Sequence, residues 1–108
     1  MLNYIYVKMK QSFYLTSSTM KNKRFMIINK LNNKKIHFGS PFHENYNILN
    51  MDDERKFRYI KRHEKNEDWT INGINTAGFW SRWLLWNKKG LMSSIKDTEE
   101  RFNINIEL

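Results

Sequence analysis

Apolar and polar residues alternate in the first part of the chain, whereas apolar residues recur every three to four positions after residue 50. Two stretches rich in β-branched and aromatic residues, 24–30 and 34–40, are separated by a short Leu-Asn-Asn segment. Asparagine tolerates the positive φ that tight turns between strands require, so this pattern predicts a β-hairpin over about 24–39. Because side chains alternate between the two faces of a strand, we expect Phe25 and Ile27 to share one face.

Both ends of the chain also carry strand-like patterns. Residues 2–10 alternate loosely and contain aromatic and β-branched side chains, which favours a strand. Residues 11–19 are polar with scattered aromatics, and we interpret them as a linker or arm. Residues 102–108 alternate with a period of two, which predicts a closing strand added to the hairpin sheet.

A first helix is predicted over about 52–66, after a loop at 39–50. Asn50 can cap it, and the acidic residues Asp52, Asp53 and Glu54 lie where the helix dipole favours negative charge. One arc of this helix is apolar and the opposite arc is basic. The apolar arc holds Phe57, Tyr59, Ile60 and His63. The basic arc holds Arg55, Arg58, Lys61, Arg62 and Lys65.

Three tryptophans are crowded into a second predicted helix, over about 76–87. Trp80, Trp83 and Trp86 follow helical spacing, and Ser81 and Arg82 are the polar residues among them. Rings that stack on nucleic-acid bases normally lie on sheets or loops between basic residues. A helix that is apolar nearly all round belongs in a core. The rings are therefore predicted to build the core, with Trp80 or Trp86 left partly exposed as a contact.

A third helix is predicted over about 90–102, beginning at Gly90 and repeating apolar residues at helical spacing. Together these elements predict an α+β fold, in which a small antiparallel sheet packs against three helices. The sheet would combine the hairpin with the terminal strands. The chain length suits one domain, which we place at 20–108, with 1–19 as an N-terminal extension or arm.

The charge of the chain is +8 and is concentrated at its front. Residues 1–50 carry a net charge of +7, whereas residues 51–108 carry +1. A basic front half suits an acidic partner, either nucleic acid or an acidic protein surface. The predicted contact residues are the basic arc of the first helix together with Lys21, Lys23, Arg24, Lys34, Lys35 and Arg82. The alternative for the basic arc is a solvated face partly paired with Glu54, Glu64 and Asp68.

Other site chemistry finds little support in the sequence. Cysteine is absent, which excludes disulfides and thiolate chemistry. His37, His43 and His63 lack the spacing of familiar metal sites, so we predict no metal and no cofactor. His63 falls on an apolar arc and is expected to be packed. We also expect no enzyme activity, no signal peptide and no membrane span.

Several blocks together carry a family resemblance. They are IHFG at 36–39, Tyr46, DDERKFRYIKRHEKNEDW at 52–69, TAGFWSRWLLWNK at 76–88 and SIKDTEERF at 94–102. The combination resembles a family of small uncharacterised basic proteins encoded by giant nucleocytoplasmic large DNA viruses. The resemblance covers about Phe25 to Phe102. It implies a viral protein made in the cytoplasm of infected cells and found in the virion. Relatives usually begin near the position of Met20, and they tend to have proline where this chain has Lys89.

Two functions follow as expectations. The first is a virion structural component, a minor capsid or capsid-associated protein whose basic face docks on an acidic protein surface. Residues 1–19 would then be available to add a strand to a neighbouring subunit. The alternative is a nucleic-acid-binding protein that packages or shields viral DNA.

Overall fold

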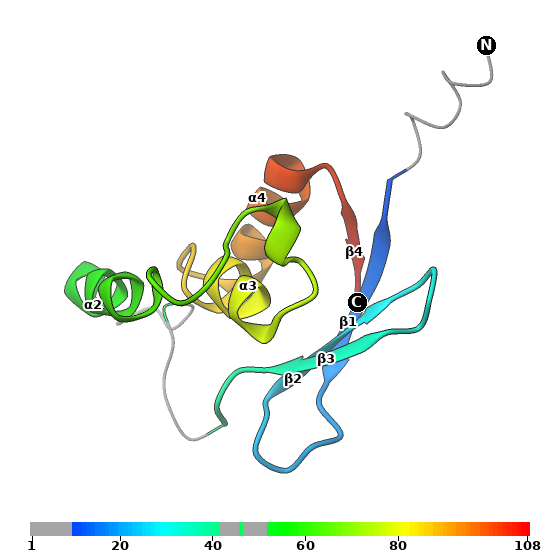
Figure 1. Cartoon of the computed structure of the whole chain (residues 1–108), viewed down its shortest axis with the longest axis horizontal. Coiled ribbons are helices and arrows are strands. Elements are labelled where there is room, and N and C mark those ends of the chain that lie inside the picture. The colour runs from blue at the N-terminus through cyan, green and yellow to red at the C-terminus, as the bar shows by residue number, and fades with distance from the viewer. Residues whose placement is uncertain (1–9, 42–45, 47–51) are drawn as a thin grey trace.

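A four-stranded sheet lies beside a group of helices in the computed structural model, which describes residues 10–41, Tyr46 and 52–108 (Figure 1). The strands are β1 (Ser12–Ser17), β2 (Phe25–Asn29), β3 (Lys35–Phe38) and β4 (Asn105–Glu107). The helices are α2 (Asp53–His63), α3 (Ala77–Trp80) and α4 (Leu91–Phe102), with a 3₁₀ turn, η1 (Ile71–Gly73), and a π-helical turn, η2 (Ser81–Leu85). The predicted α+β class, with three helices, is confirmed.

The predicted hairpin is formed by β2 and β3. The two strands pair antiparallel with Phe25 opposite Phe38, and their connecting turn holds Asn33 at a φ of 60°. This positive φ is the conformation for which the asparagines were expected. Ile27 is fully buried in the core and Phe25 packs against it, as predicted for residues on one face.

The predicted linker at 11–19 was wrong, because it contains the strand β1. This strand is central in the sheet order β3-β2-β1-β4, and its Phe13 and Leu15 are buried in the core. Alternation of these two residues with polar neighbours was the available signal. One edge of β1 pairs with β2 over 13–17 and the other pairs with β4 over 12–14, so β1 belongs to the chain's own sheet. The strand predicted within 2–10 lies almost wholly outside the described residues.

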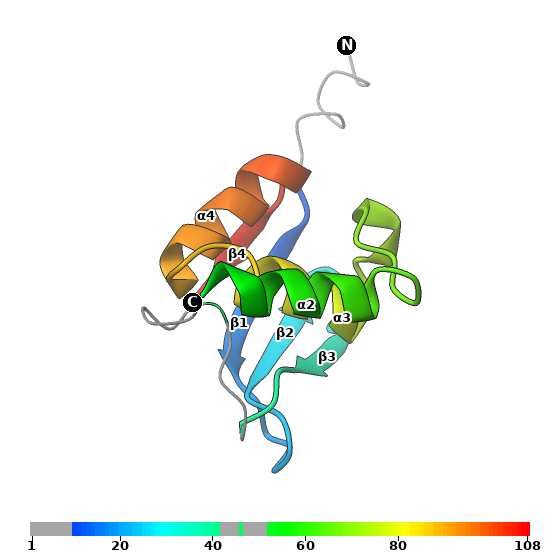
Figure 2. The same ribbon diagram turned by 90° about the vertical axis from the view of Figure 1, so that its left-hand side faces the viewer.

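The purely antiparallel sheet was also wrong, since β4 pairs parallel to β1. After the hairpin the chain forms α2, α3 and α4, and β4 then runs beside β1 (Figures 1 and 2). The crossover connection between β1 and β4 therefore contains all three helices. Such crossovers join parallel strands. At the end of α4, Asn103 takes a left-handed conformation with a φ of 55°, and the chain then enters β4. The predicted closing strand exists, but it joins β1 and not the hairpin directly.

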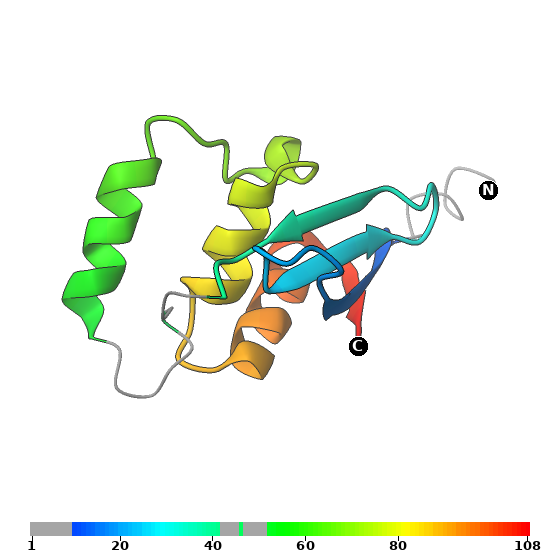
Figure 3. The same ribbon diagram turned by 90° about the horizontal axis from the view of Figure 1, so that it is seen from below.

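The tryptophan-containing segment, α3 with η2, lies between α2 and the sheet (Figure 3). Its large side chains are buried in the core. Trp80 is fully buried between Phe13 and Phe79, and its Nε1 donates to the carbonyl oxygen of Ile74 at 2.8 Å. Trp83 is also buried. The prediction that the rings build the core is confirmed, and Trp86 is the ring that stays partly exposed. The predicted single helix is divided, because α3 passes into the wider turn η2.

α2 is the outermost helix (Figure 3), and side-chain contacts attach it to the molecule. Tyr59 stacks on Trp86 with ring centroids 4.5 Å apart. The ammonium of Lys56 donates to the carbonyl oxygen of Asn87 at 2.7 Å. Asp52 caps the helix by accepting from the backbone of Arg55, whereas the expected cap Asn50 lies outside the described residues.

The arc of α2 that faces the molecule is rotated from the predicted one. Tyr59 is buried and His63 partly buried, but Phe57 is 58% exposed. The helical wheel placed Phe57 on the apolar arc, but the structure leaves it exposed. The inner face instead uses the aliphatic stem of Lys56, whose ammonium reaches a backbone carbonyl, as amphipathic side chains can.

Candidate binding surfaces

The outer side of α2 carries the exposed charges that the sequence predicted. We call it the α2 basic face, and it consists of Arg55, Arg58, Lys61, Arg62 and Lys65, all exposed. Arg58 lies 3.0 Å from Glu54, and Lys61 lies 3.7 Å from Glu64. Exposed pairs of this kind contribute only about 0–1 kcal/mol. The cations in these pairs can therefore exchange their carboxylate partners for those of another molecule at little cost.

The basic residues of the hairpin region do not extend this face as a single surface. Lys34 and Lys35 lie at the β2–β3 turn, at the opposite end of the molecule from α2 (Figures 1 and 3). Lys21 and Lys23 lie in the β1–β2 connection. The contact residues that the sequence predicted are thus spread over several separate parts of the surface. Of these lysines, Lys23 lines the cleft that faces α2.

Two of the predicted contact arginines are engaged within the protein. Arg24 donates to the carbonyl oxygen of Pro41 at 3.4 Å and is only partly exposed. The guanidinium of Arg82 lies 4.4 Å from the Trp83 ring centroid and donates to the carbonyl oxygen of Trp86 at 2.8 Å. Burial lowers the pKa of Arg82. Arg82 therefore helps to bind the core together and is poorly placed to contact a partner.

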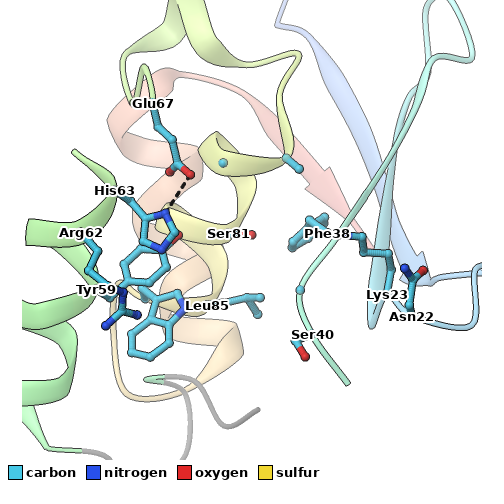
Figure 4. Close-up of a pocket in the computed structure, with 14 residues that line it drawn as sticks. Asn22, Lys23, Phe38, Ser40, Tyr59, Arg62, His63, Glu67, Ser81 and Leu85 are labelled. Carbon is cyan, nitrogen blue, oxygen red and sulfur yellow. Dashed lines mark hydrogen bonds and ion pairs between the residues drawn. The ribbon is translucent and has the colours of Figure 1, made fainter. Parts of the chain in front are cut away.

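A cleft of about 520 Å³ opens between α2 on one side and the end of β3 with the β1–β2 connection on the other (Figure 4). The α2 wall presents Arg62 and His63, beside the stacked Tyr59 and Trp86. The opposite wall and the floor are formed by Asn22, Lys23, Phe38, Gly39, Ser40, Ala77, Gly78, Ser81 and Leu85. Sequence reasoning missed this cleft because its two walls come from segments that are distant in the chain.

Glu67 supplies the negative charge of the cleft and is held in place by two neighbours. Its Oε1 accepts from the indole N–H of Trp69 at 2.8 Å, and its Oε2 lies 3.1 Å from Nδ1 of His63. The carboxylate also lies against Gly78, where an added Cβ would come within 2.7 Å of Glu67. The cleft thus has a fixed carboxylate at one side and cations on both walls (Figure 4).

An aromatic column supports the α2 wall of the cleft. Tyr59 is stacked on Trp86, nearly parallel at 6°, and its ring also lies 4.4 Å from that of His63. Burial and the charge of Glu67 raise the pKa of Tyr59, so its hydroxyl stays protonated in the physiological range. His63 is packed, as expected from its position on the helix.

The acidic residues at the start of α2 have structural partners. Asp52 is the helix cap, and Asp53 accepts from the hydroxyl of Tyr46. This hydrogen bond lowers the pKa of Asp53 and raises that of Tyr46. Among the described residues, no group of three or more His, Asp or Glu side chains is arranged to hold a metal ion. His37 contacts the hydroxyl of Ser18 at 2.8 Å, and His43 lies outside the described residues.

Comparison with known proteins gives one match. Residues 14–63 match the model of a family of unknown function (DUF5754). The match begins inside β1 and ends with α2, so it includes the hairpin, residues from both walls of the cleft and most of the α2 basic face. It also reaches into the stretch predicted to be an N-terminal extension. Comparisons with curated proteins and with solved structures gave no match. No helix in the described part of the chain is long and apolar enough to cross a bilayer.

Proposed function

We propose that this protein is a non-enzymatic structural component of a giant-virus particle, which docks on an acidic protein surface through the α2 basic face. The observation that carries the proposal is the row of exposed cations on the outermost helix. The resemblance of about Phe25 to Phe102 to small giant-virus proteins supports the virion and the infected-cell cytoplasm as its locations. A minor capsid or capsid-associated protein is the role that joins these two points.

The spacing of the α2 basic face suits contact along one edge of a partner. Arg55, Arg58 and Arg62 are separated by three and four residues, so they line up on one side of α2, and Lys65 follows in the turn after the helix. At about 1.5 Å of rise per residue, the arginine row is about 10 Å long. Guanidinium groups bind carboxylates with two parallel hydrogen bonds, which makes arginine well suited to an acidic protein surface.

The second candidate function is binding of nucleic acid, which the lysines of the loops favour. Lys21, Lys34 and Lys35 are exposed, and no carboxylate pairs with them in the described part of the chain. Trp80 and Trp83 are buried and offer no platform for bases. Such a protein would therefore bind phosphates and show a steep salt dependence without sequence preference.

Zero-length cross-linking of purified particles tests the docking proposal. A carbodiimide joins a lysine amine to a carboxylate only when the two are in contact. We expect the protein in the shell fraction by mass spectrometry, with cross-links from Lys61 or Lys65 to acidic residues of a shell protein. Lys34 and Lys35 are the internal control, because they lie at the far end of the molecule. Absence of the protein from the shell, or cross-links confined to the control lysines, would contradict the proposal.

Gel retardation distinguishes the nucleic-acid alternative. The purified chain is mixed with duplex DNA at rising salt, and the double variant Arg58→Glu with Arg62→Glu is compared with Lys34→Glu and Lys35→Glu, which changes the charge equally. DNA binding that falls steeply with salt and is lost in either variant favours the alternative. Weak retardation that the α2 variant does not change favours protein docking. Deletion of 1–19 is unsuitable for testing the arm because it removes β1, whereas deletion of 1–9 leaves β1 intact.

A further inference from the structure

The cleft between α2 and the hairpin has the composition of a small-ligand site. Its volume of about 520 Å³ lies within the range of about 300–1,000 Å³ that is usual for ligand pockets. Ligand pockets combine apolar and aromatic walls with a few polar groups that orient the ligand. Here Trp86 and Leu85 provide apolar wall, and Asn22 and Ser81 provide polar groups.

The cleft contains two cations, on opposite walls, and one carboxylate. Lys23 and Arg62 stand on opposite walls, and neither is paired with a carboxylate within the described residues (Figure 4). These cations favour an anionic group on the ligand. Glu67 is the carboxylate of the same cleft, and its position is fixed by Trp69 and His63. Each carboxylate oxygen has two acceptor sites, so Glu67 retains capacity to accept from amino groups of a ligand.

We propose that this cleft binds a small molecule that joins a phosphate to a flat ring bearing an amino group, and a nucleoside monophosphate with an amino-bearing base is the class that fits. The phosphate faces Arg62 and Lys23, the ring lies against the apolar wall at Trp86, and the amino group donates to Glu67. This site shares Arg62 with the α2 basic face, but its other groups, Lys23, Glu67 and Trp86, lie outside that face.

Titration of the full chain with adenosine 5′-monophosphate, followed by NMR of the indole N–H groups, tests the proposal. We expect saturable binding with a Kd at or below about 1 mM. The indole signal of Trp86, assigned with Trp86→Phe, should shift, and that of the fully buried Trp80 should stay unchanged. Adenosine alone, inorganic phosphate alone and uridine 5′-monophosphate should each bind at least about tenfold more weakly, since each lacks at least one recognised group.

Matched variants distinguish binding in the cleft from non-specific attraction of the ligand to positive charge. Arg62→Ala should weaken binding about tenfold or more, whereas Arg58→Ala, which removes the same charge from the outer side of α2, should not. Lys23→Ala and Lys21→Ala form a second pair in the β1–β2 connection. Lys23→Ala should weaken binding, whereas Lys21→Ala should not, because Lys23 lines the cleft and Lys21 does not. Glu67→Gln should reduce the preference for the adenine nucleotide over the uracil nucleotide.

Three results would overturn the site: no saturable binding of the adenine nucleotide, equal losses in Arg62→Ala and Arg58→Ala, or inorganic phosphate binding as tightly as the nucleotide. None of them bears on the particle cross-links, so failure here and failure of docking can be told apart. Conversely, loss of docking in particles would leave nucleotide binding by the cleft unaffected.

Discussion

Replacement of Trp80 by alanine is the sharpest test of the core. Trp80 has no exposed surface, packs against Phe13 with ring centroids 5.0 Å apart, and hydrogen-bonds to the carbonyl oxygen of Ile74 at 2.8 Å. Truncation of a buried tryptophan to alanine usually costs about 3–5 kcal/mol, which includes the lost burial and the cavity left behind. Since the Ile74 carbonyl also loses its donor, we expect Trp80→Ala to lower the free energy of unfolding by about 4–5 kcal/mol.

Trp80→Phe divides this loss into its parts. Phenylalanine keeps much of the apolar volume but cannot donate to Ile74, so we expect a smaller loss of about 2 kcal/mol. Phe57→Ala is the control, because Phe57 is 58% exposed and should cost no more than about 0.5 kcal/mol. All three variants would be unfolded in urea and followed by far-UV circular dichroism, which does not depend on the tryptophan signal.

The ranking of the three losses in unfolding free energy shows whether the Trp80 indole supports the core. Domains of this kind have total stabilities of about 5–15 kcal/mol, so Trp80→Ala is expected to remove between about a quarter and nearly all of the stability. A loss below about 1.5 kcal/mol, or one equal to that of Phe57→Ala, would refute the conclusion that this indole supports the core.

Three further changes test other parts of the structure. Gly73→Ala should destabilise the chain by about 2–3 kcal/mol in thermal unfolding, because its Cβ would lie 1.8 Å from the carbonyl oxygen of Asp68; a change below about 0.5 kcal/mol would contradict that close approach. Thr98→Val should cost about 1 kcal/mol in urea, since the buried hydroxyl lies 2.7 Å from the Ser94 carbonyl oxygen, and an unchanged midpoint would argue against this bond. Burial opposes ionisation of Asp97, but hydrogen bonds from Asn87 and Arg101 outweigh it and lower its pKa below 3.8. Ionised Asp97 therefore stabilises the fold above its unfolded-state pKa, and this stability is lost as the pH falls through its lower folded-state pKa. Asp97→Asn should consequently reduce the drop in unfolding free energy between about pH 6 and pH 2.

The candidate binding residues were only partly accessible to sequence reasoning. The α2 basic face was found because helical spacing and charge type alone place Arg58 and Arg62 on the exposed arc. Arg82 was assigned to the same surface by its charge, and the structure instead packs it on Trp83. The cleft could not be predicted, because it joins Lys23 to Arg62 across segments whose meeting depends on the packing of the whole chain.

Local signals in the sequence determined the hairpin, the three helical regions and the burial of the indoles. A turn needs residues that accept positive φ, a helix needs a cap and an apolar repeat, and a crowded apolar helix needs a core; each condition is met within a short window. The tertiary structure decided that residues 12–17 form a central strand and that β4 runs parallel to it. It also decided which arc of α2 faces the cleft. These outcomes depend on contacts between distant segments, and the periodicity of a single stretch carries no information about its partner.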